Sequence, residues 1–192
     1  MEALRVRRPS PGDGAGIARV HVQAWQAAYA GLMPAAYLAA MDEEERAQAW
    51  EARVAGEQTA FTRFDHETMI AEAGESPPLE IVGIATVGPD RDDPAASVGE
   101  LWMINVLPAA WGTGVGPQLL ASASNRLVEL GFTEAVLWVV KGNARARRFY
   151  EREGWVPDGG EKRQVFGDRL VREVRYTTTL IGARRPAGQG SR

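Results

Sequence analysis

The spacing of apolar and polar residues changes several times along the chain, and each change predicts an element. Residues 4–8 alternate, which is typical of a strand. Asp13 stands where a helix N-cap belongs, and apolar residues then recur at helical spacing over 17–28. The pattern continues with a short helix over 35–41, a helix over 42–54 with an acidic first turn, two hairpin strands over 67–73 and 79–87, and a loop over 88–97.

The middle of the chain predicts a parallel strand pair. Residues 101–107 form a strongly apolar strand, the turn Trp111–Gly116 follows, and a helical pattern then runs to Gly131. Residues 135–140 are continuously apolar, as in a strand buried on both faces. Strand, helix and strand in this order form a parallel crossover. The remaining pattern predicts a helix from Asn143 to Glu153, ended by Gly154, and closing strands over 155–156 and 169–180.

Composition narrows the class of protein. With 192 residues, the chain is expected to form one domain over 1–182, followed by a flexible tail over 183–192. A net charge of −3 argues against a nucleic-acid binder, and the absence of a long apolar run argues against a membrane protein or a signal peptide. Without Cys, and with only His21 and His66, no metal site is expected, and the expected compartment is the cytoplasm.

The turn Trp111–Gly116 is the strongest candidate for a binding motif. Its three alternate glycines precede an amphipathic helix, so backbone N–H groups and the positive helix end can cradle a phosphate or pyrophosphate. No Gly-Lys-Ser/Thr follows, which excludes a P-loop, and Pro117 breaks the dinucleotide fingerprint. By itself the turn is equally compatible with a purely structural role.

Four motifs in order make the segment 101–155 resemble the GNAT (Gcn5-related N-acetyltransferase) superfamily. They are Val106-Leu-Pro108, Trp111-x-x-Gly114-x-Gly116, Asn143 and Phe149-Tyr-Glu-x-x-Gly-Trp155. The resemblance implies an α+β fold, in which a mixed, mostly antiparallel sheet flanked by helices contains a splayed parallel central strand pair. It also implies direct transfer of an acetyl group from acetyl-CoA to a primary amine, without a metal. The family usually carries Gln or Arg where Trp111 stands here, but its turn binds mainly through backbone amides.

The resemblance also implies a set of residues that bind acetyl-CoA. The pantetheine arm is expected to pair with the strand end, and the pyrophosphate is expected on the glycine turn. Asn143 matches a position that contacts the arm, although a helix N-cap explains it equally well. The expected cofactor-binding residues are Ile104, Asn105, Val106, Gly112, Thr113, Gly114, Val115, Gly116, Pro117, Asn143 and Phe149.

Two residues are candidates for the chemistry. Tyr150 matches the family tyrosine that protonates the departing thiolate, a role that suits a phenol, which is protonated at neutral pH; its alternative is aromatic packing. Glu100 lies where several relatives carry a proton-accepting carboxylate, and its alternative is an exposed charge at a strand end. His21 is a weaker candidate for the base, and the glutamate that other relatives use falls on Trp138. The backbone N–H of Val106 or its neighbour is the expected oxyanion donor.

Other features leave alternatives open. Arg145, Arg147 and Arg148 form a basic cluster that suits CoA phosphates or a solvated helix face. The acceptor, a small molecule or a peptide amine, is not identified, and the oligomeric state stays open, a homodimer included. The rival functions are a catalytically degenerate CoA-binding module, the same fold with another acyl-CoA, and nucleotide binding by the turn. Residues expected to line an acceptor pocket, or to belong to the ordinary core, are Trp25, Tyr29, Tyr37 and Trp102.

Overall fold

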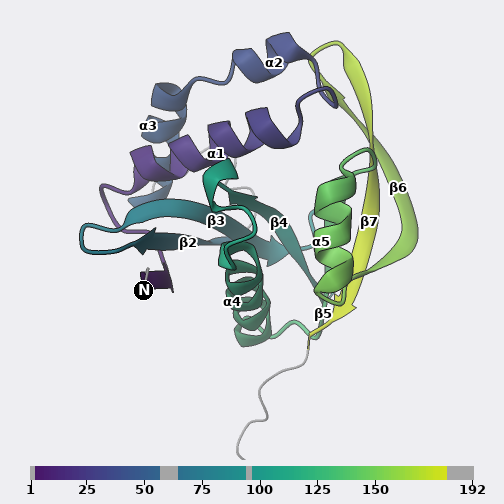
Figure 1. Ribbon diagram of the computed structural model, residues 1–192. Coiled ribbons are helices and arrows are strands. Elements are labelled where there is room, and N and C mark those ends of the chain that lie inside the picture. The colour runs from purple at the N-terminus through teal and green to yellow at the C-terminus, as the bar shows by residue number, and fades with distance from the viewer. Residues whose placement is uncertain (1–2, 57–64, 94–96, 181–192) are drawn as a thin grey trace, which may run out of the picture.

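A seven-stranded sheet in the order β1-β2-β3-β4-β5-β7-β6 runs through the molecule (Figure 1). The computed structural model describes residues 3–56, 65–93 and 97–180. Among the described strands, the β4–β5 pair is parallel and every other pair is antiparallel. The predicted fold class is therefore confirmed. The strands are β1 (Ala3–Arg7), β2 (Glu67–Gly74), β3 (Glu80–Pro89), β4 (Val98–Val106), β5 (Glu134–Val140), β6 (Val156–Phe166) and β7 (Arg169–Thr179).

Helices cover both faces of this sheet (Figure 1). Neighbouring strand residues alternate between the faces, so Ala71 and Ala85 pack toward α4 whereas Ile70 and Ile84 pack toward α1 and α3. None of the described helices is long and apolar enough to cross a membrane. The helices are α1 (Gly14–Ala28), α2 (Ala35–Ala39), α3 (Glu43–Val54), α4 (Val115–Glu129) and α5 (Ala144–Arg152), with a short 3₁₀ turn at Pro108–Ala110.

The parallel pair β4–β5 is splayed at one end. Val98–Leu101 pair with Glu134–Leu137, and the pairing then stops. β4 continues to Val106 and stays paired with β3 there, while β5 continues to Val140 alongside β7. The facing edges of β4 and β5 are therefore unpaired beyond Leu101, as the family resemblance implied.

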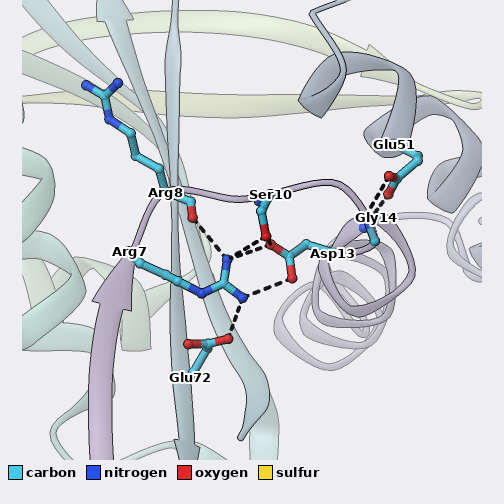
Figure 2. A network of polar contacts seen from close by, with 8 residues as sticks. Arg7, Arg8, Ser10, Asp13, Gly14, Glu51 and Glu72 are labelled. Carbon is cyan, nitrogen blue, oxygen red and sulfur yellow. Dashed lines mark hydrogen bonds and ion pairs between the residues drawn. The ribbon is translucent and has the colours of Figure 1, made fainter. Parts of the chain in front are cut away.

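The start of α1 is capped differently from the expectation (Figure 2). Asp13 occupies the N-cap position, but its carboxylate binds the Arg7 guanidinium at 2.6 and 3.0 Å and the Ser10 N–H at 2.6 Å. These contacts, that of Arg7 first, lower the pKa of Asp13. The N–H of Gly14 instead donates to Glu51 of α3 at 3.0 Å. A Cβ at Gly14 would lie 2.7 Å from the Ala47 carbonyl, so glycine allows this close approach of α1 and α3.

The last hairpin is longer than predicted. β6 spans eleven residues, against the two predicted over 155–156. Its side chains are mostly exposed and polar, and the register shifts between Pro157 and Glu161, so the apolar pattern of a buried strand is missing. The predicted tail over 183–192 lies outside the described residues.

Candidate functional site

The glycine turn leads directly into α4 and has the backbone geometry of an anion cradle. Gly112 and Gly114 adopt positive φ angles of 81° and 94°, and Gly114 is the N-cap of α4. Both residues are exposed. The Thr113 hydroxyl donates to the Ala110 carbonyl at 2.8 Å, which closes the turn. The first N–H groups of α4 lack partners within the helix, so they can bind an anion.

The splayed edge of β4 lies directly before this turn. The Leu107 N–H donates to the Val82 carbonyl on the β3 side at 2.9 Å. Because backbone groups alternate along an antiparallel ladder, those of Ile104 and Val106 point to the opposite edge, which β5 has left. An extended, amide-bearing ligand can add there as a strand. The backbone of Asn105 points to β3, and its side-chain amide contacts the Met103 sulfur at 3.9 Å.

Trp111 connects the turn to β4. Its indole N–H donates to the Val106 carbonyl at 2.8 Å, and the Arg145 guanidinium of α5 lies over its ring at 3.2 Å. The sequence predicted no role for this side chain. The structure shows that it joins the strand end, the turn and α5.

Asn143 is buried at the start of α5, between β5 and the helix. Its Oδ1 accepts from the Ala146 N–H at 3.0 Å, so the capping interpretation is confirmed. Phe149 comes from the same helix, and a Cβ at Gly116 would lie 3.4 Å from its ring. The cap fixes the start of α5, and the approach of Phe149 to Gly116 places this helix against the start of α4. A contact of Asn143 with a ligand stays a prediction.

Tyr150 is buried at 8% exposure, which confirms the packing interpretation of this residue. Its ring lies 5.2 Å from Phe149, 6.4 Å from Trp155 and 6.3 Å from Tyr176. Within the described part of the chain, no residue forms a hydrogen bond with its hydroxyl group, so the phenol is available to a ligand. Burial, with a smaller contribution from Tyr29, raises the pKa of Tyr150. The phenol therefore keeps its proton at neutral pH.

Glu100 is at 1% exposure, so the alternative of an exposed strand-end charge is wrong. Its carboxylate accepts from the backbone N–H of Arg91 at 2.9 Å and from its guanidinium at 3.0 and 2.5 Å. Leu101 packs toward α4, so Glu100 faces the α1 side of the sheet. This carboxylate already has strong donors.

His21 lies between two tryptophans. Its ring centroid is 5.6 Å from that of Trp25 and 6.2 Å from that of Trp50. Burial, with smaller contributions from Arg46 and Arg53, lowers the pKa of His21 to about 3. A base with so low a pKa is almost never protonated at neutral pH and accepts a proton poorly.

Three of the four predicted pocket aromatics lie together. Trp25 and Tyr29 are 5.0 Å apart, and Phe166, absent from the prediction, joins Trp25 at 6.1 Å and Tyr37 at 5.6 Å. All four rings are half-buried against the core under α1 and α2. The fourth predicted aromatic, Trp102, instead stacks on His66 at 5.0 Å and donates to the Pro89 carbonyl.

Sequence reasoning missed Glu173 of β7, which lies beside these rings. It has the same strand parity as Val171, which packs in the core under α1 and α2, and it pairs with Val140 at the end of β5. Burial raises the pKa of Glu173; Lys162 and Arg91 oppose the shift, whereas Asp92 and Glu100 add to it. Glu173 in turn contributes to raising the pKa of Tyr29 to about 12, chiefly a burial effect. In the sequence, Glu173 lies two residues after Val171, and this spacing on a strand could have indicated that Glu173 faces the core.

Two hollows in the surface lie away from most of these residues. A cavity of about 340 Å³ is lined by Arg8, Trp50 and Glu67 among others. It lies beside β1 and β2, and β3 and β4 separate these strands from β5 in the sheet. A second, of about 260 Å³, reaches the turn only at Thr113 and Val115. Neither hollow includes Tyr150 or Asn143, so neither coincides with the candidate site at the open edge between β4 and β5.

Comparisons with known proteins agree with this arrangement. The Acetyltransferase (GNAT) family model matches residues 24–155. The uncharacterized N-acetyltransferase YuaI of Bacillus subtilis (strain 168) is 30% identical over 140 residues, which are 73% of each chain. A mycothiol acetyltransferase of Parafrankia sp. (strain EAN1pec) is 37% identical over 67 residues, but these are 33% of this chain and 21% of that one.

Two solved structures share the fold. The PaiA N-acetyltransferase from Thermoplasma acidophilum, in complex with coenzyme A, has a TM-score of 0.66 at 17% identity and covers 92% of this chain and 99% of its own. YncA of Salmonella typhimurium, a putative acetyltransferase solved with acetyl-CoA, has a TM-score of 0.65 at 20% identity, with coverages of 97% and 99%. With the family match over residues 24–155, these findings show that the chain is an N-acetyltransferase of the GNAT family.

Proposed function

We propose that this enzyme transfers an acetyl group from acetyl-CoA directly to a primary amine. The observation that carries the proposal is the splayed edge of β4 running into the exposed glycine turn, with Tyr150 buried on the adjoining helix. The same fold binds coenzyme A in the Thermoplasma acidophilum protein and acetyl-CoA in the Salmonella typhimurium protein.

The donor would bind along three segments. The amides of the pantetheine arm would pair with the free backbone groups of Ile104, which leaves the N–H of Val106 to the thioester carbonyl; the Val106 carbonyl already accepts from Trp111. The pyrophosphate would lie on the turn Gly112–Pro117, held by the backbone N–H groups of residues 112–116, since Pro117 has no N–H to donate. Asn143 would offer its amide NH₂ to the arm while Oδ1 caps α5, and Phe149 would pack beside it.

The reaction needs two proton transfers besides the new bond. The amine nitrogen attacks the thioester carbon, and the carbonyl electron pair moves to oxygen, where the Val106 N–H on the splayed edge can stabilise it. As the C–S bond breaks, the Tyr150 hydroxyl gives its proton to sulfur. The surplus proton on the new amide nitrogen returns to the tyrosinate through water.

An acceptor amine also arrives as an ammonium ion and must lose one proton before it attacks. We propose Glu173 for this step in preference to Glu100. Both face the α1 side of the sheet, but Glu100 is held by Arg91, whereas no described residue forms a hydrogen bond or ion pair with the Glu173 carboxylate. Burial raises the pKa of Glu173, which makes it a stronger base than an ordinary glutamate.

Release of free thiol from acetyl-CoA tests the proposal. Purified protein is incubated with acetyl-CoA and separately with spermidine, phenethylamine, methionine and an alanine-initiated peptide. We expect thiol release that depends on one of these amines, and a mass increase of the amine that corresponds to one acetyl group.

Two outcomes would favour the rivals. Tight acetyl-CoA binding without thiol release from any amine would indicate a CoA-binding module. Faster release from succinyl-CoA than from acetyl-CoA would indicate another acyl donor. A thermal-shift series covers nucleotide binding, because a ligand at a hundred times its Kd stabilises the fold by about 2.7 kcal/mol; stabilisation by ATP or NAD alone would contradict the proposal.

A further inference from the structure

The glycine turn has no charged side chain of its own. Residues 107–118, from Leu107 to Gln118, include neither an acidic nor a basic residue. Backbone N–H groups and the helix end supply partial positive charge there, whereas a pyrophosphate carries two negative charges. A cation from another segment would therefore strengthen binding.

Of the three arginines at the start of α5, the structure aims one at this turn. Arg145 lies over the Trp111 ring at 3.2 Å, with no ion pair or hydrogen bond to its guanidinium among the described residues. Arg147 instead donates to the Tyr176 hydroxyl at 3.0 Å and to the Lys141 carbonyl at 3.4 Å. Arg148 is exposed and contacts neither the turn nor Trp111 in the described structure.

Stacking leaves the guanidinium able to bind an anion. An arginine that lies flat on an aromatic face keeps the N–H groups around its edge free to donate, and these match two phosphate oxygens at once. Trp111 is itself fixed, because its indole N–H donates to the Val106 carbonyl at 2.8 Å. The side chain of Arg145 is thus held beside the turn before any ligand arrives.

We propose that Arg145 binds the pyrophosphate of the acyl-CoA donor, and that Trp111 is the positioning residue that holds it there. This inference rests on the proposed function only in taking a CoA thioester as the donor. It assigns the charged side chain of the phosphate site to α5, in addition to the N–H groups of the turn, and it gives the Trp111 side chain a role in donor binding.

Calorimetric binding of three probes tests the assignment. Coenzyme A carries the pyrophosphate and the 3′-phosphate, 3′-dephospho-CoA carries the pyrophosphate alone, and pantetheine carries neither. Arg145→Gln is expected to weaken coenzyme A and 3′-dephospho-CoA equally, by about tenfold, and to leave pantetheine unchanged. Arg148→Gln is the matched control and should change none of the three.

The role of Trp111 is tested by a double-mutant cycle. Trp111→Leu should weaken coenzyme A several-fold in the wild-type background and have little effect on top of Arg145→Gln, because the stacking partner is already gone. Trp111→Phe keeps an aromatic ring but loses the hydrogen bond to Val106. Its affinity for coenzyme A should lie between those of the wild type and Trp111→Leu. Thermal unfolding of each variant shows that it is folded.

Each contrary result has its own meaning. Equal affinity of Arg145→Gln and wild type for coenzyme A overturns the inference, and so does a loss confined to coenzyme A, which would place Arg145 at the 3′-phosphate. Additive losses from Trp111→Leu and Arg145→Gln overturn the positioning role. Failure of the wild type to bind coenzyme A or 3′-dephospho-CoA would instead contradict the proposed donor.

Discussion

Arg91 holds both carboxylate oxygens of Glu100, with Nη2 2.5 Å from Oε1 and Nε 3.0 Å from Oε2. The pair fastens the loop after β3 to the start of β4, close to where β4 leaves β5. Glu100 is almost fully buried, whereas the side chain of Arg91 is 42% exposed. The two partners therefore differ in what their loss leaves behind.

Removing Arg91 should destabilise the protein more than neutralising Glu100. Arg91→Met leaves a buried carboxylate without its partner, for an expected loss of about 3 kcal/mol in the free energy of unfolding. Glu100→Gln leaves a half-exposed guanidinium that water can solvate, for an expected loss of about 1 kcal/mol. Urea unfolding at pH 7 measures both values, and the reverse order would contradict this account of the pair.

Replacing Tyr150 should remove turnover and leave donor binding intact. Tyr150→Phe keeps the ring among its aromatic neighbours but has no proton for the thiolate, so kcat should fall by about 10²- to 10⁴-fold while the Kd for acetyl-CoA stays unchanged. Because burial raises the pKa of Tyr150 above its usual value of about 10, the wild-type kcat should not decline between pH 7 and about 9.5.

Tyr176→Phe is the matched control for the Tyr150 variant. It removes a neighbouring phenol whose hydroxyl interacts with Arg147 and Glu151, and should alter stability but not kcat. Equal loss of kcat in the two variants would show that packing, rather than proton donation, matters at Tyr150.

Glu173→Gln should abolish the acidic limb of the pH–rate profile. Because burial raises its pKa, the wild-type carboxylate becomes protonated at a higher pH than an ordinary glutamate does. As the pH is lowered, kcat/KM should therefore begin to decline at a higher pH than the pKa of an ordinary glutamate predicts. The variant should have a low rate with no such limb. Glu134→Gln, at the exposed start of β5, should retain the wild-type profile. A limb that persists in Glu173→Gln would exclude this residue as the proton acceptor.

Glu173→Gln should lower the rate but raise the stability of the protein at neutral pH. A raised pKa in the folded state means that folding favours the protonated carboxyl, so its stabilising contribution is present below the unfolded-state pKa and is lost as the pH rises through the folded-state value. Glu173→Gln should therefore be more stable than wild type at neutral pH, and this advantage should vanish in acid. Thermal unfolding at several pH values measures the difference.

The cap on α1 should be lost with Glu51 rather than with the residue that precedes the helix. Glu51→Ala removes the acceptor of the Gly12 and Gly14 N–H groups, for an expected loss of about 1 kcal/mol. Gln48→Ala, exposed on the same helix, should cost little. If thermal unfolding gives equal losses for the two variants, Glu51 does not act as the cap.

The features that the sequence predicted correctly are local ones. The glycine turn at the start of α4, the Asn143 cap and the end of α5 next to Gly154 each depend on a few neighbouring residues, so residue type and spacing were sufficient. The buried strand over 135–140 was visible because its apolar run has no polar interruption.

The features that it missed join distant segments or lack an apolar pattern. Arg91 reaches Glu100 across a loop, and Glu51 caps a helix that begins 37 residues earlier; neither is visible from spacing along one element. Most of β6 was missed because its exposed side chains are polar. From the sequence, Arg145 could not be distinguished from Arg147 and Arg148, because its position over the Trp111 ring depends on the fold.

The parallel pairing of β4 and β5 ends at Leu101, and beyond it the sheet lacks one line of main-chain hydrogen bonds. A donor whose arm fills that line becomes a temporary member of the sheet, so loading and local folding are coupled there. Amide protons that face β3, such as that of Leu107, are protected at all times, whereas those of Ile104 and Val106 exchange with solvent until the arm arrives. Deuterium uptake at these two positions would therefore record occupancy of the site without any turnover.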